Sequence, residues 1–374
     1  MNSSTKKAYY VLLIVLFIFL IQPGGGTWSY IYNVRWLYVF FLSFITANLL
    51  VPASIYAGRK FNILDYPDSR KIHTEPVPRI GGVAVFIAFL ITILRNLSFS
   101  TELLGLLIAG TLIFLLGFFD DVKGIPATPR LIVQIVATSI VIFSGLRITA
   151  VPMSFPLSFF LNIIITFLWF TGITNAVNFL DGIDGLVASF GILCSLTFFL
   201  IAIPTYQKFL AYLCIALAGS CLGFLPYNWH RAKVFLGDSG STFIGFMLAG
   251  FSVMGTWAEG NAYVALSTPI LILGVPIFDM IYTTISRIKN RQVRTVKEWL
   301  DYVGRDHFHH RLLKIGFSIR KSVGFIILVN LCLALGALII RDAGTKGSAL
   351  LLVQAFGIFL IIVSLMLAGR EKGE

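Results

Sequence analysis

The stretch NAVNFLDGIDGLVASFG, residues 175–191, places two carboxylates and two amides between two long apolar runs. The runs extend over about 157–177 and 185–203. Each is close to the roughly 20 residues that a helix needs to cross a hydrocarbon core of about 30 Å. Polar groups at such a position are costly unless they face a cavity or a partner. The stretch therefore predicts two membrane helices joined at a polar site.

The composition extends this prediction to the whole chain. Hydrophobic residues make up 57% and charged residues 12%, against roughly 25% charged residues in a soluble domain, and the mean hydropathy is +0.88. We therefore expect an all-α, polytopic integral membrane protein with eleven or twelve transmembrane helices. Spans are predicted near 8–22, 36–57, 80–96, 101–119, 130–150, 157–177, 185–203, 209–226, 240–257, 262–285, 321–341 and 347–369.

The first span is the weakest, because it is short and three glycines follow it. A signal peptide starting at Lys6 and Lys7 is an alternative, but no small-x-small cleavage site follows, so a retained anchor is favoured. Residues 1–35 then form an extra helix with an external loop, and residues 36–374 form the main domain. Cysteines at 194, 214, 221 and 332 all fall in predicted spans and are expected to be packing residues.

The basic residues give the orientation, since cytoplasmic loops carry an excess of Lys and Arg. With the amino terminus inside, 23 of the 29 basic residues lie on the cytoplasmic side. The predicted cytoplasmic loops lie near 58–80, 120–130, 178–185, 227–240 and 287–320. Topology alone accounts for this pattern; the functional alternative is a site for anionic substrates or lipid head groups. We expect an inner (plasma) membrane protein with its active site facing the cytoplasm and no nucleic-acid partner.

Five aspartates fall at helix ends on this same side: Asp120, Asp121, Asp181, Asp184 and Asp238. Carboxylates gathered in one site repel one another unless a cation lies among them. Oxygen ligands without cysteine favour Mg²⁺, with Mn²⁺ as a second option. The sequence therefore predicts a divalent-metal site at the cytoplasmic boundary.

Two motifs hold four of these aspartates. In FFDDVKG, residues 118–124, Asp120 and Asp121 end an apolar run, where the negative end of the helix dipole would disfavour them without a cation; a solvated helix terminus is the alternative. In the opening stretch, Gly182 and Gly185 predict a break that brings the backbone close to a ligand. There the alternative is a hydrogen-bonded packing motif between helices.

The fifth aspartate lies in FLGDSGS, residues 235–241, which predicts a tight loop entering a helix. Asp238 is offered as a ligand, and Ser239 or Ser241 as a helix cap. The flanking glycines allow backbone amides to approach a phosphate. A similar string surrounds the nucleophile of serine hydrolases, but no plausible Ser-His-Asp set accompanies it here.

A last motif, GRDHFHHRL at residues 304–312, lies in the longest and most basic loop. Its three histidines beside Arg305 and Arg311 suggest anion binding. A zinc site competes with this reading, but no cysteine is near and the basic neighbours would repel a metal. An exposed polar helix is the remaining alternative. The histidines are His307, His309 and His310.

Together the four motifs resemble the polyprenyl-phosphate N-acetylhexosamine-1-phosphate transferases. The resemblance covers roughly residues 36–369, and KIHTEPVPRIGG, residues 71–82, is similar to a further family signature. HFHHRL resembles the H-x-H-H loop of the group that uses UDP-N-acetylglucosamine. The H-H-H-F-E pattern of the UDP-MurNAc-pentapeptide group is absent. The family usually has eleven spans, so the helix near 8–22 is additional.

The resemblance implies that a polyprenyl (undecaprenyl) phosphate attacks the β-phosphorus of UDP-GlcNAc and releases UMP, as the first membrane step of a surface glycan such as lipopolysaccharide or teichoic acid. It implies Asp238 as the Mg²⁺ ligand, with Asp120 and Asp121 near metal and lipid phosphate. The implied catalytic set is Asp120, Asp121, Asp181, Asp238 and His307. The implied substrate-binding set is Lys71, His73, Arg79, Asn175, Asn178, Asp184, Phe235, Arg305, His309 and His310, with Asp184 and Phe235 holding the uridine.

Several points stay open in the sequence. Direct attack is favoured over an aspartyl intermediate, because a phosphate monoester with a second pKa near 6 has little proton left to lose at neutral pH. A secondary transporter would need carboxylates near mid-membrane, and a CDP-alcohol phosphotransferase would need an arginine after the D-G motif. Asp279 is either functional or the cap of a kink at Pro276. The oligomeric state is open, with a homodimer as one option.

Overall fold

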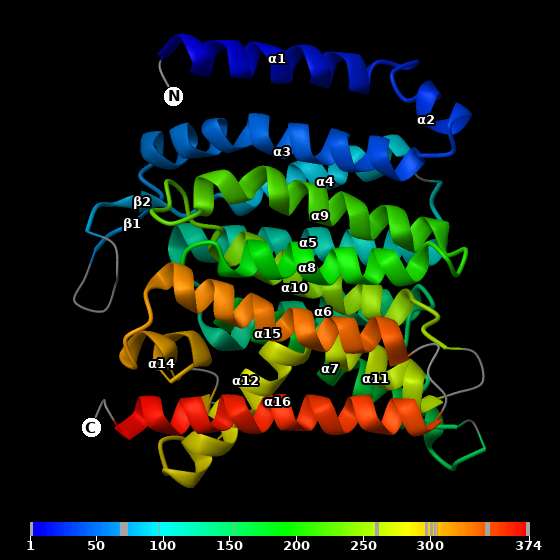
Figure 1. Ribbon diagram of the computed structural model, residues 1–374, viewed down its shortest axis with the longest axis vertical. Helices are drawn as coiled ribbons and strands as arrows, with labels where there is room; N and C mark the ends of the chain where they lie inside the picture. The colour runs from blue at the N-terminus through cyan, green and yellow to red at the C-terminus, as the bar shows by residue number, and fades with distance from the viewer. Residues whose placement is uncertain are drawn as a thin grey trace.

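The computed structural model describes residues 3–67, 74–96, 98–152, 154–258, 262–295, 298–299, 302, 304, 306–340 and 345–371. Most of its helices run side by side along one direction and form a single bundle (Figure 1). The helices are α1 (Ser3–Ile21), α2 (Thr27–Ile31), α3 (Arg35–Lys60), α4 (Gly82–Asn96), α5 (Thr101–Lys123), α6 (Ala127–Phe143), α7 (Ser158–Leu180), α8 (Leu186–Ala202), α9 (Lys208–Asn228), α10 (Gly237–Met254), α11 (Ala262–Ile272), α12 (Gly274–Lys289), α14 (Phe308–Lys314), α15 (Ile319–Ile340) and α16 (Thr345–Glu371).

The all-α membrane class predicted from the sequence is confirmed. In the described chain, seven helices are long and apolar enough to cross a membrane, or eight if the bent pair α11–α12 counts as one span. The helices α4, α6 and α8 are apolar but have only 15, 17 and 17 residues. The α10 helix occupies a further expected span and begins with the polar residues GDSGS. The count of eleven or twelve crossings therefore stays a prediction.

The α10 helix lies at the centre of the bundle, where it packs against α4, α5, α7 and α8. Most of its residues are buried. Small residues let backbones approach closely, which is how helices associate in lipid. A Cβ atom on Gly82 of α4, for example, would lie 2.3 Å from the backbone nitrogen of Gly240. This close packing fixes the start of α10, where Asp238 lies.

The predicted span at 262–285 is broken in the structure. The α11 and α12 helices meet at an angle of 81°, and α12 begins at Gly274 with Pro276 in its first turn. Asn330 of α15 takes up backbone groups freed at the break: its Nδ2 donates to the carbonyl of Ile272 at 3.1 Å, and its Oδ1 accepts from the Val275 amide at 3.5 Å. A side chain from a neighbouring helix thus stabilises the break.

The α1 helix packs on α3. The Tyr9 hydroxyl donates to Asn48 Oδ1 at 3.0 Å, and the Tyr38 hydroxyl donates to the Leu20 carbonyl at 2.7 Å.

Cys194, Cys214 and Cys221 are buried and Cys332 is half-buried, all as free thiols, which confirms their prediction as packing residues.

One end of the bundle carries the motifs. We call it the aspartate end, defined by Asp120, Asp121, Asp181, Asp184 and Asp238. The two short strands β1 (Leu64–Asp65) and β2 (Val77–Pro78) and the α14 helix lie at this end, on the left of Figure 1, and α2 lies at the opposite end. The strands pair antiparallel, Leu64 with Pro78 and Asp65 with Val77.

Candidate functional site

A cleft of about 750 Å³ opens at the aspartate end. Segments far apart in the sequence build its walls: β2 and the turn after it, the α7–α8 junction, the loop between α9 and α10, the start of α10, and α14. The predicted site residues that line it are Arg79, Asn178, Asp181, Asp184, Phe235, Asp238 and His310.

Asp238 lies in the cleft with its side chain 25% exposed. Asn178 of α7 orients it: the Asn178 Nδ2 donates to Asp238 Oδ1 at 2.7 Å and to Ser241 Oγ at 2.9 Å. Gly237, directly before it, has φ +74°, and a Cβ there would lie 2.0 Å from the Arg79 carbonyl oxygen. Only glycine allows this approach, so the G-D order of the motif fixes where the carboxylate lies.

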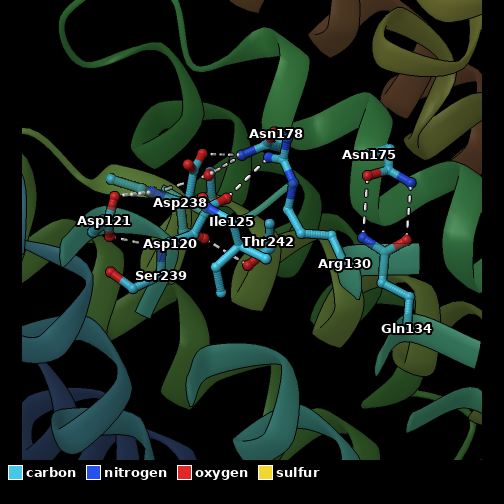
Figure 2. A network of polar contacts seen from close by, with 12 residues as sticks. Asp120, Asp121, Ile125, Arg130, Gln134, Asn175, Asn178, Asp238, Ser239 and Thr242 are labelled. Atoms are coloured by element: carbon cyan, nitrogen blue, oxygen red, sulfur yellow. Dashed lines mark hydrogen bonds and ion pairs between the residues drawn. The ribbon is translucent and has the colours of Figure 1, made fainter. Parts of the chain in front are cut away.

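Asp121 of α5 lies directly behind Asp238, with a side chain that is 0% exposed (Figure 2). Its Oδ1 accepts the amide of Asp238 at 2.9 Å and its Oδ2 accepts the amide of Ser239 at 3.0 Å. The first amides of a helix have no partner within the helix and carry partial positive charge. Asp121 therefore caps α10 from a neighbouring helix.

Asp120 has both carboxylate oxygens engaged as well (Figure 2). Its Oδ1 accepts the Ile125 amide at 2.5 Å, and its Oδ2 pairs with Arg130 Nη1 at 2.9 Å. The sequence predicted a cation to offset two carboxylates at a helix C-terminus. In this structure an arginine lies next to each of the two carboxylates: Arg130 pairs with Asp120, and Arg79 pairs with Asp121.

Arg79 lies among three carboxylates. Its Nε is 3.3 Å from Asp121 Oδ1, its Nη2 3.6 Å from Asp238 Oδ2, and its Nη1 3.9 Å from Asp65 Oδ1. Burial opposes its charge, but the carboxylates of Asp121, Asp238 and Asp65 outweigh that effect and raise the pKa of Arg79. A fixed positive charge of this kind suits an anionic ligand.

The predicted break between Asn175 and Gly191 is confirmed, since α7 ends at Leu180 and α8 begins at Leu186. Burial, followed by the carboxylates of Asp238 and Asp121, raises the pKa of Asp181 to about 8. Asp184 Oδ2 lies 3.0 Å from His230 Nδ1 and accepts the Ala232 amide at 3.2 Å. The two aspartates of one motif thus have different surroundings.

Asn175 is turned away from the cleft. It exchanges two hydrogen bonds with Gln134 of α6, at 3.1 and 3.0 Å (Figure 2). It also donates to the Thr171 carbonyl at 2.9 Å. In this structure it joins α7 to α6, so the packing alternative describes this residue well.

The histidine loop places only one of its three predicted rings on the cleft. His310 lines the cleft, whereas His307 and His309 are 6% and 1% exposed. Burial, followed by His310 and His307, lowers the pKa of His309 well below the ordinary value, and neither of its ring nitrogens has a hydrogen-bond partner in the described part of the chain. Lys71, His73 and Arg305 lie outside the described residues, so their predicted roles stay predictions.

Some residues around the site were missed by sequence reasoning. His230 lines the cleft and pairs with Asp184. Asn228 joins two walls: its Oδ1 accepts the Gly185 amide and its Nδ2 donates to the Val234 carbonyl, both at 3.0 Å. Both lie in NWHRAK, residues 228–233, a polar string between an apolar span and FLGDSGS; its position beside that motif is the signal that could have found them.

Cleft chemistry is compatible with Mg²⁺. Among the described residues, no three His, Cys, Asp or Glu side chains form a group that could hold a metal ion. Magnesium in phosphate sites, however, commonly uses one or two carboxylates together with substrate phosphate oxygens and water. Asp238 and Asp181 provide two carboxylates in the cleft, and after burial the Asp238 carboxylate is the next cause that raises the pKa of Asp181. The donor set therefore fits the ion.

Known proteins resemble this chain at two levels. Residues 103–256, which include the aspartate pair, the α7–α8 junction and the start of α10, match the model of the glycosyl transferase family 4. The class is thus a membrane-embedded glycosyl transferase.

Individual relatives narrow the class. The chain is 30% identical over 353 residues to a probable undecaprenyl-phosphate N-acetylglucosaminyl 1-phosphate transferase of Bacillus subtilis, covering 91% of this chain and 93% of the relative. It is 32% identical over 350 residues to a decaprenyl-phosphate N-acetylglucosaminephosphotransferase of Mycolicibacterium smegmatis, covering 84% and 85%. The chain therefore belongs to the polyprenyl-phosphate N-acetylhexosamine-1-phosphate transferase family, in its N-acetylglucosamine group.

A relative from another group covers less of the chain. The phospho-N-acetylmuramoyl-pentapeptide-transferase of Enterococcus faecalis is 35% identical over 197 residues, which is 47% of this chain and 61% of the relative.

Proposed function

We propose that the protein transfers GlcNAc-1-phosphate from UDP-GlcNAc to polyprenyl phosphate, giving polyprenyl-diphosphate-GlcNAc and UMP. The observation that carries the proposal is the cleft at the aspartate end, where acidic and basic side chains meet at one end of a bundle of membrane helices. A soluble nucleotide and a lipid phosphate can meet only at such a boundary. The names of the relatives support N-acetylglucosamine as the sugar.

The residues of the cleft divide into three roles. Asp238, oriented by Asn178, is the proposed Mg²⁺ ligand, and the ion would neutralise charge on the reacting phosphates. Arg79 and His310 contribute positive charge or hydrogen bonds to the diphosphate. Asp184 and Phe235 form the proposed nucleotide wall, with His230 beside them. Phosphoryl transfer depends mostly on such positioning and charge neutralisation.

Direct attack by the lipid phosphate is the proposed mechanism. A phosphate monoester has a second pKa near 6, so at neutral pH the acceptor is already largely ionised and little proton remains for a carboxylate base to remove. The surroundings of Asp120 support this, because its two oxygens already accept hydrogen bonds from Ile125 and Arg130. Those contacts leave Asp120 poorly placed as a nucleophile.

The membrane location and the orientation of the active site are proposed from the charge pattern. The excess of basic residues on the loops of the aspartate end supports an active site that faces the cytoplasm from the plasma membrane. The reaction would then begin a surface glycan on its carrier lipid. UDP-MurNAc-pentapeptide is the second candidate donor, favoured by the partial match to the Enterococcus enzyme, and HFHHRL argues against it.

Purified protein incubated with undecaprenyl phosphate, Mg²⁺ and a panel of UDP-sugars tests the proposal. We expect UMP release with UDP-GlcNAc and little with the other donors. Turnover of UDP-MurNAc-pentapeptide with none of UDP-GlcNAc would overturn the donor assignment. A transporter would release no UMP from any donor.

The mechanism has its own test, in which the enzyme meets UDP-GlcNAc without lipid acceptor. Direct attack predicts that UMP stays absent until the acceptor is added. Stoichiometric UMP release, with a labelled sugar phosphate found on Asp120 or Asp121 by mass spectrometry and discharged by acceptor at the turnover rate, would establish the covalent route instead.

A further inference from the structure

Asp279, the acidic residue that sequence reasoning could not place, has two partners at the start of α14. It lies in α12 and is 2% exposed. Its Oδ2 lies 2.8 Å from His307 Nδ1, and its Oδ1 accepts the Phe308 amide at 2.8 Å. One carboxylate therefore holds two consecutive residues, at the helix end where negative charge is favourable.

The second nitrogen of the His307 ring is held from the other side. Arg287 Nη2 lies 3.1 Å from His307 Nε2, and a guanidinium can only donate. The ring therefore accepts at Nε2 and donates at Nδ1 to the Asp279 carboxylate. Arg287 is fixed in turn by a two-pronged pair with Asp306, with both contacts at 2.7 Å. Both ring nitrogens of His307 are thus used inside the protein.

The start of α14 decides where the next two histidines lie. His309 packs beneath the α7–α8 junction, where a Cβ on Gly182 would lie 2.0 Å from its Nε2. His310 is the following residue and lines the cleft. The α14 helix spans only Phe308–Lys314 and packs on α15 and α16, and the Asp279 contacts hold its first turn against α12. A shift at His307 would move His310 with it.

We propose that Asp279 is a positioning residue, which acts through His307 and the Phe308 amide to hold α14 so that His310 faces the donor diphosphate. His307 is then a tether with a fixed tautomer, and His310 is the ring of this loop that meets the substrate. The proposal rests on the function proposed above. It also assigns a role to Asp279 that differs from a cap on the α11–α12 break, which Asn330 stabilises.

The test is Asp279→Asn in full-length protein. Asparagine keeps an acceptor for the Phe308 amide but can turn its amide group toward His307 Nδ1. The ring must then carry its proton on Nε2, against the Arg287 guanidinium. We expect kcat/KM for UDP-GlcNAc to fall about 10- to 100-fold, with a raised KM for UDP-GlcNAc and an unchanged KM for undecaprenyl phosphate.

Hydrogen exchange supplies a readout that needs no substrate. In Asp279→Asn, peptides covering 306–314 should exchange faster, and those covering α5 and α10 should not change. The matched control is Met280→Leu, a packing change at the next position of α12, which should leave both KM values and the exchange near α14 at parental levels. If Asp279→Asn does not fold, Arg287→Lys takes its place in the test. Lysine keeps the charge but loses the fork geometry of arginine, so the KM for UDP-GlcNAc should again rise while the KM for undecaprenyl phosphate stays unchanged.

A double variant separates positioning from general damage. If Asp279 acts through His307, Asp279→Asn combined with His307→Asn should be no worse than the poorer single variant, because coupled residues are not additive. Three results would each overturn the proposal. They are a fall in kcat with both KM values unchanged, hydrogen exchange at 306–314 that does not change in Asp279→Asn, and a double variant in which the losses of the two single variants multiply. Absence of turnover in the parent protein would instead overturn the proposed function, and the exchange readout would still test the tether.

Discussion

At the scale of single residues, the aspartates share a charge but not a role. Asp121 is wholly buried and caps α10, Asp120 is paired with Arg130, and Asp238 is partly exposed in the cleft. All three already have polar partners, but only Asp238 lines the cleft, where a metal ion can reach it. Asp238 is therefore the carboxylate of these three whose removal should affect metal response most.

Asp238→Asn should lower the rate of UMP release by about 10²- to 10³-fold and should weaken the response to Mg²⁺, because it removes a charged ligand from the cleft. Initial rates over a Mg²⁺ titration check this. Asp120→Asn is the matched control: it should also be slower, but its half-saturating Mg²⁺ concentration should stay close to the parent's. If Asp120→Asn instead weakened the Mg²⁺ response more than Asp238→Asn did, Asp120 would be the metal ligand.

Asp181 gives a pH prediction for the metal-free protein. Its pKa is about 8 in the folded protein against an ordinary value of 3.8, so the folded state binds the proton more tightly. The stability that this proton contributes is complete below about pH 4 and is lost as the pH rises to about 8. Asp181→Asn should remove this loss.

Thermal melting in detergent with EDTA measures the effect. The Tm of Asp181→Asn should exceed that of the parent increasingly between pH 5 and pH 8, by at least about 2–4 °C, and the difference should level off above pH 8. A constant difference across this range would contradict the raised pKa.

At the scale of elements, the start of α10 is the part that the site depends on. Its amides are held by Asp121 of α5, its first glycine lies against the Arg79 carbonyl, and Asn178 of α7 orients Asp238. Three segments therefore meet at one helix end. A backbone change there should act on the whole cleft.

Gly237→Ala tests this element. The residue has φ +74°, which costs an alanine about 1–2 kcal/mol, and the clash with the Arg79 carbonyl adds about 1–3 kcal/mol. We expect a lower Tm and loss of most UMP release. Gly124→Ala is the control, since Gly124 has φ +68° but nothing within 4 Å of its Cβ position. If both changes lowered the Tm and UMP release equally, the positive φ alone, without the clash at the Arg79 carbonyl, would explain the loss.

At the scale of the whole molecule, the order of helices places loops from distant parts of the chain at one end of the bundle. The aspartate pair, the α7–α8 junction, the loop before α10 and α14 all lie at the aspartate end (Figure 1). Alternate crossings of a membrane bring every second loop to the same side. The charge pattern predicts that this side is the cytoplasm.

Cysteine labelling tests the orientation. Lys123→Cys at the aspartate end should react with an impermeant thiol reagent only in inside-out vesicles, and Tyr206→Cys, at a residue that is 85% exposed in the loop between α8 and α9, only in right-side-out vesicles. The parent protein, whose four cysteines are buried or half-buried, controls for background. Labelling of position 123 from outside would reverse the topology.

The membrane class and the motifs could be predicted from the sequence, because both are local properties. A run of apolar residues identifies a membrane helix wherever it lies, and Gly182 and Gly185 mark a break without knowledge of the neighbours. The sequence likewise indicated that the aspartates gather at one boundary, since alternate loops share a side.

Only the tertiary structure decided what each polar group contacts. Asp121 meets amides 117 and 118 residues away, Asn175 meets Gln134, and Asp279 meets His307; no spacing along the chain encodes these pairs. The sequence offered a kink at Pro276 as one reading, but it did not show that Asn330 of α15 supplies the hydrogen bonds that make the bend tolerable. A sequence shows where polar side chains are needed in a membrane. Which of them face a substrate and which satisfy one another depends on how the helices pack, because a buried polar group must find its partner in space.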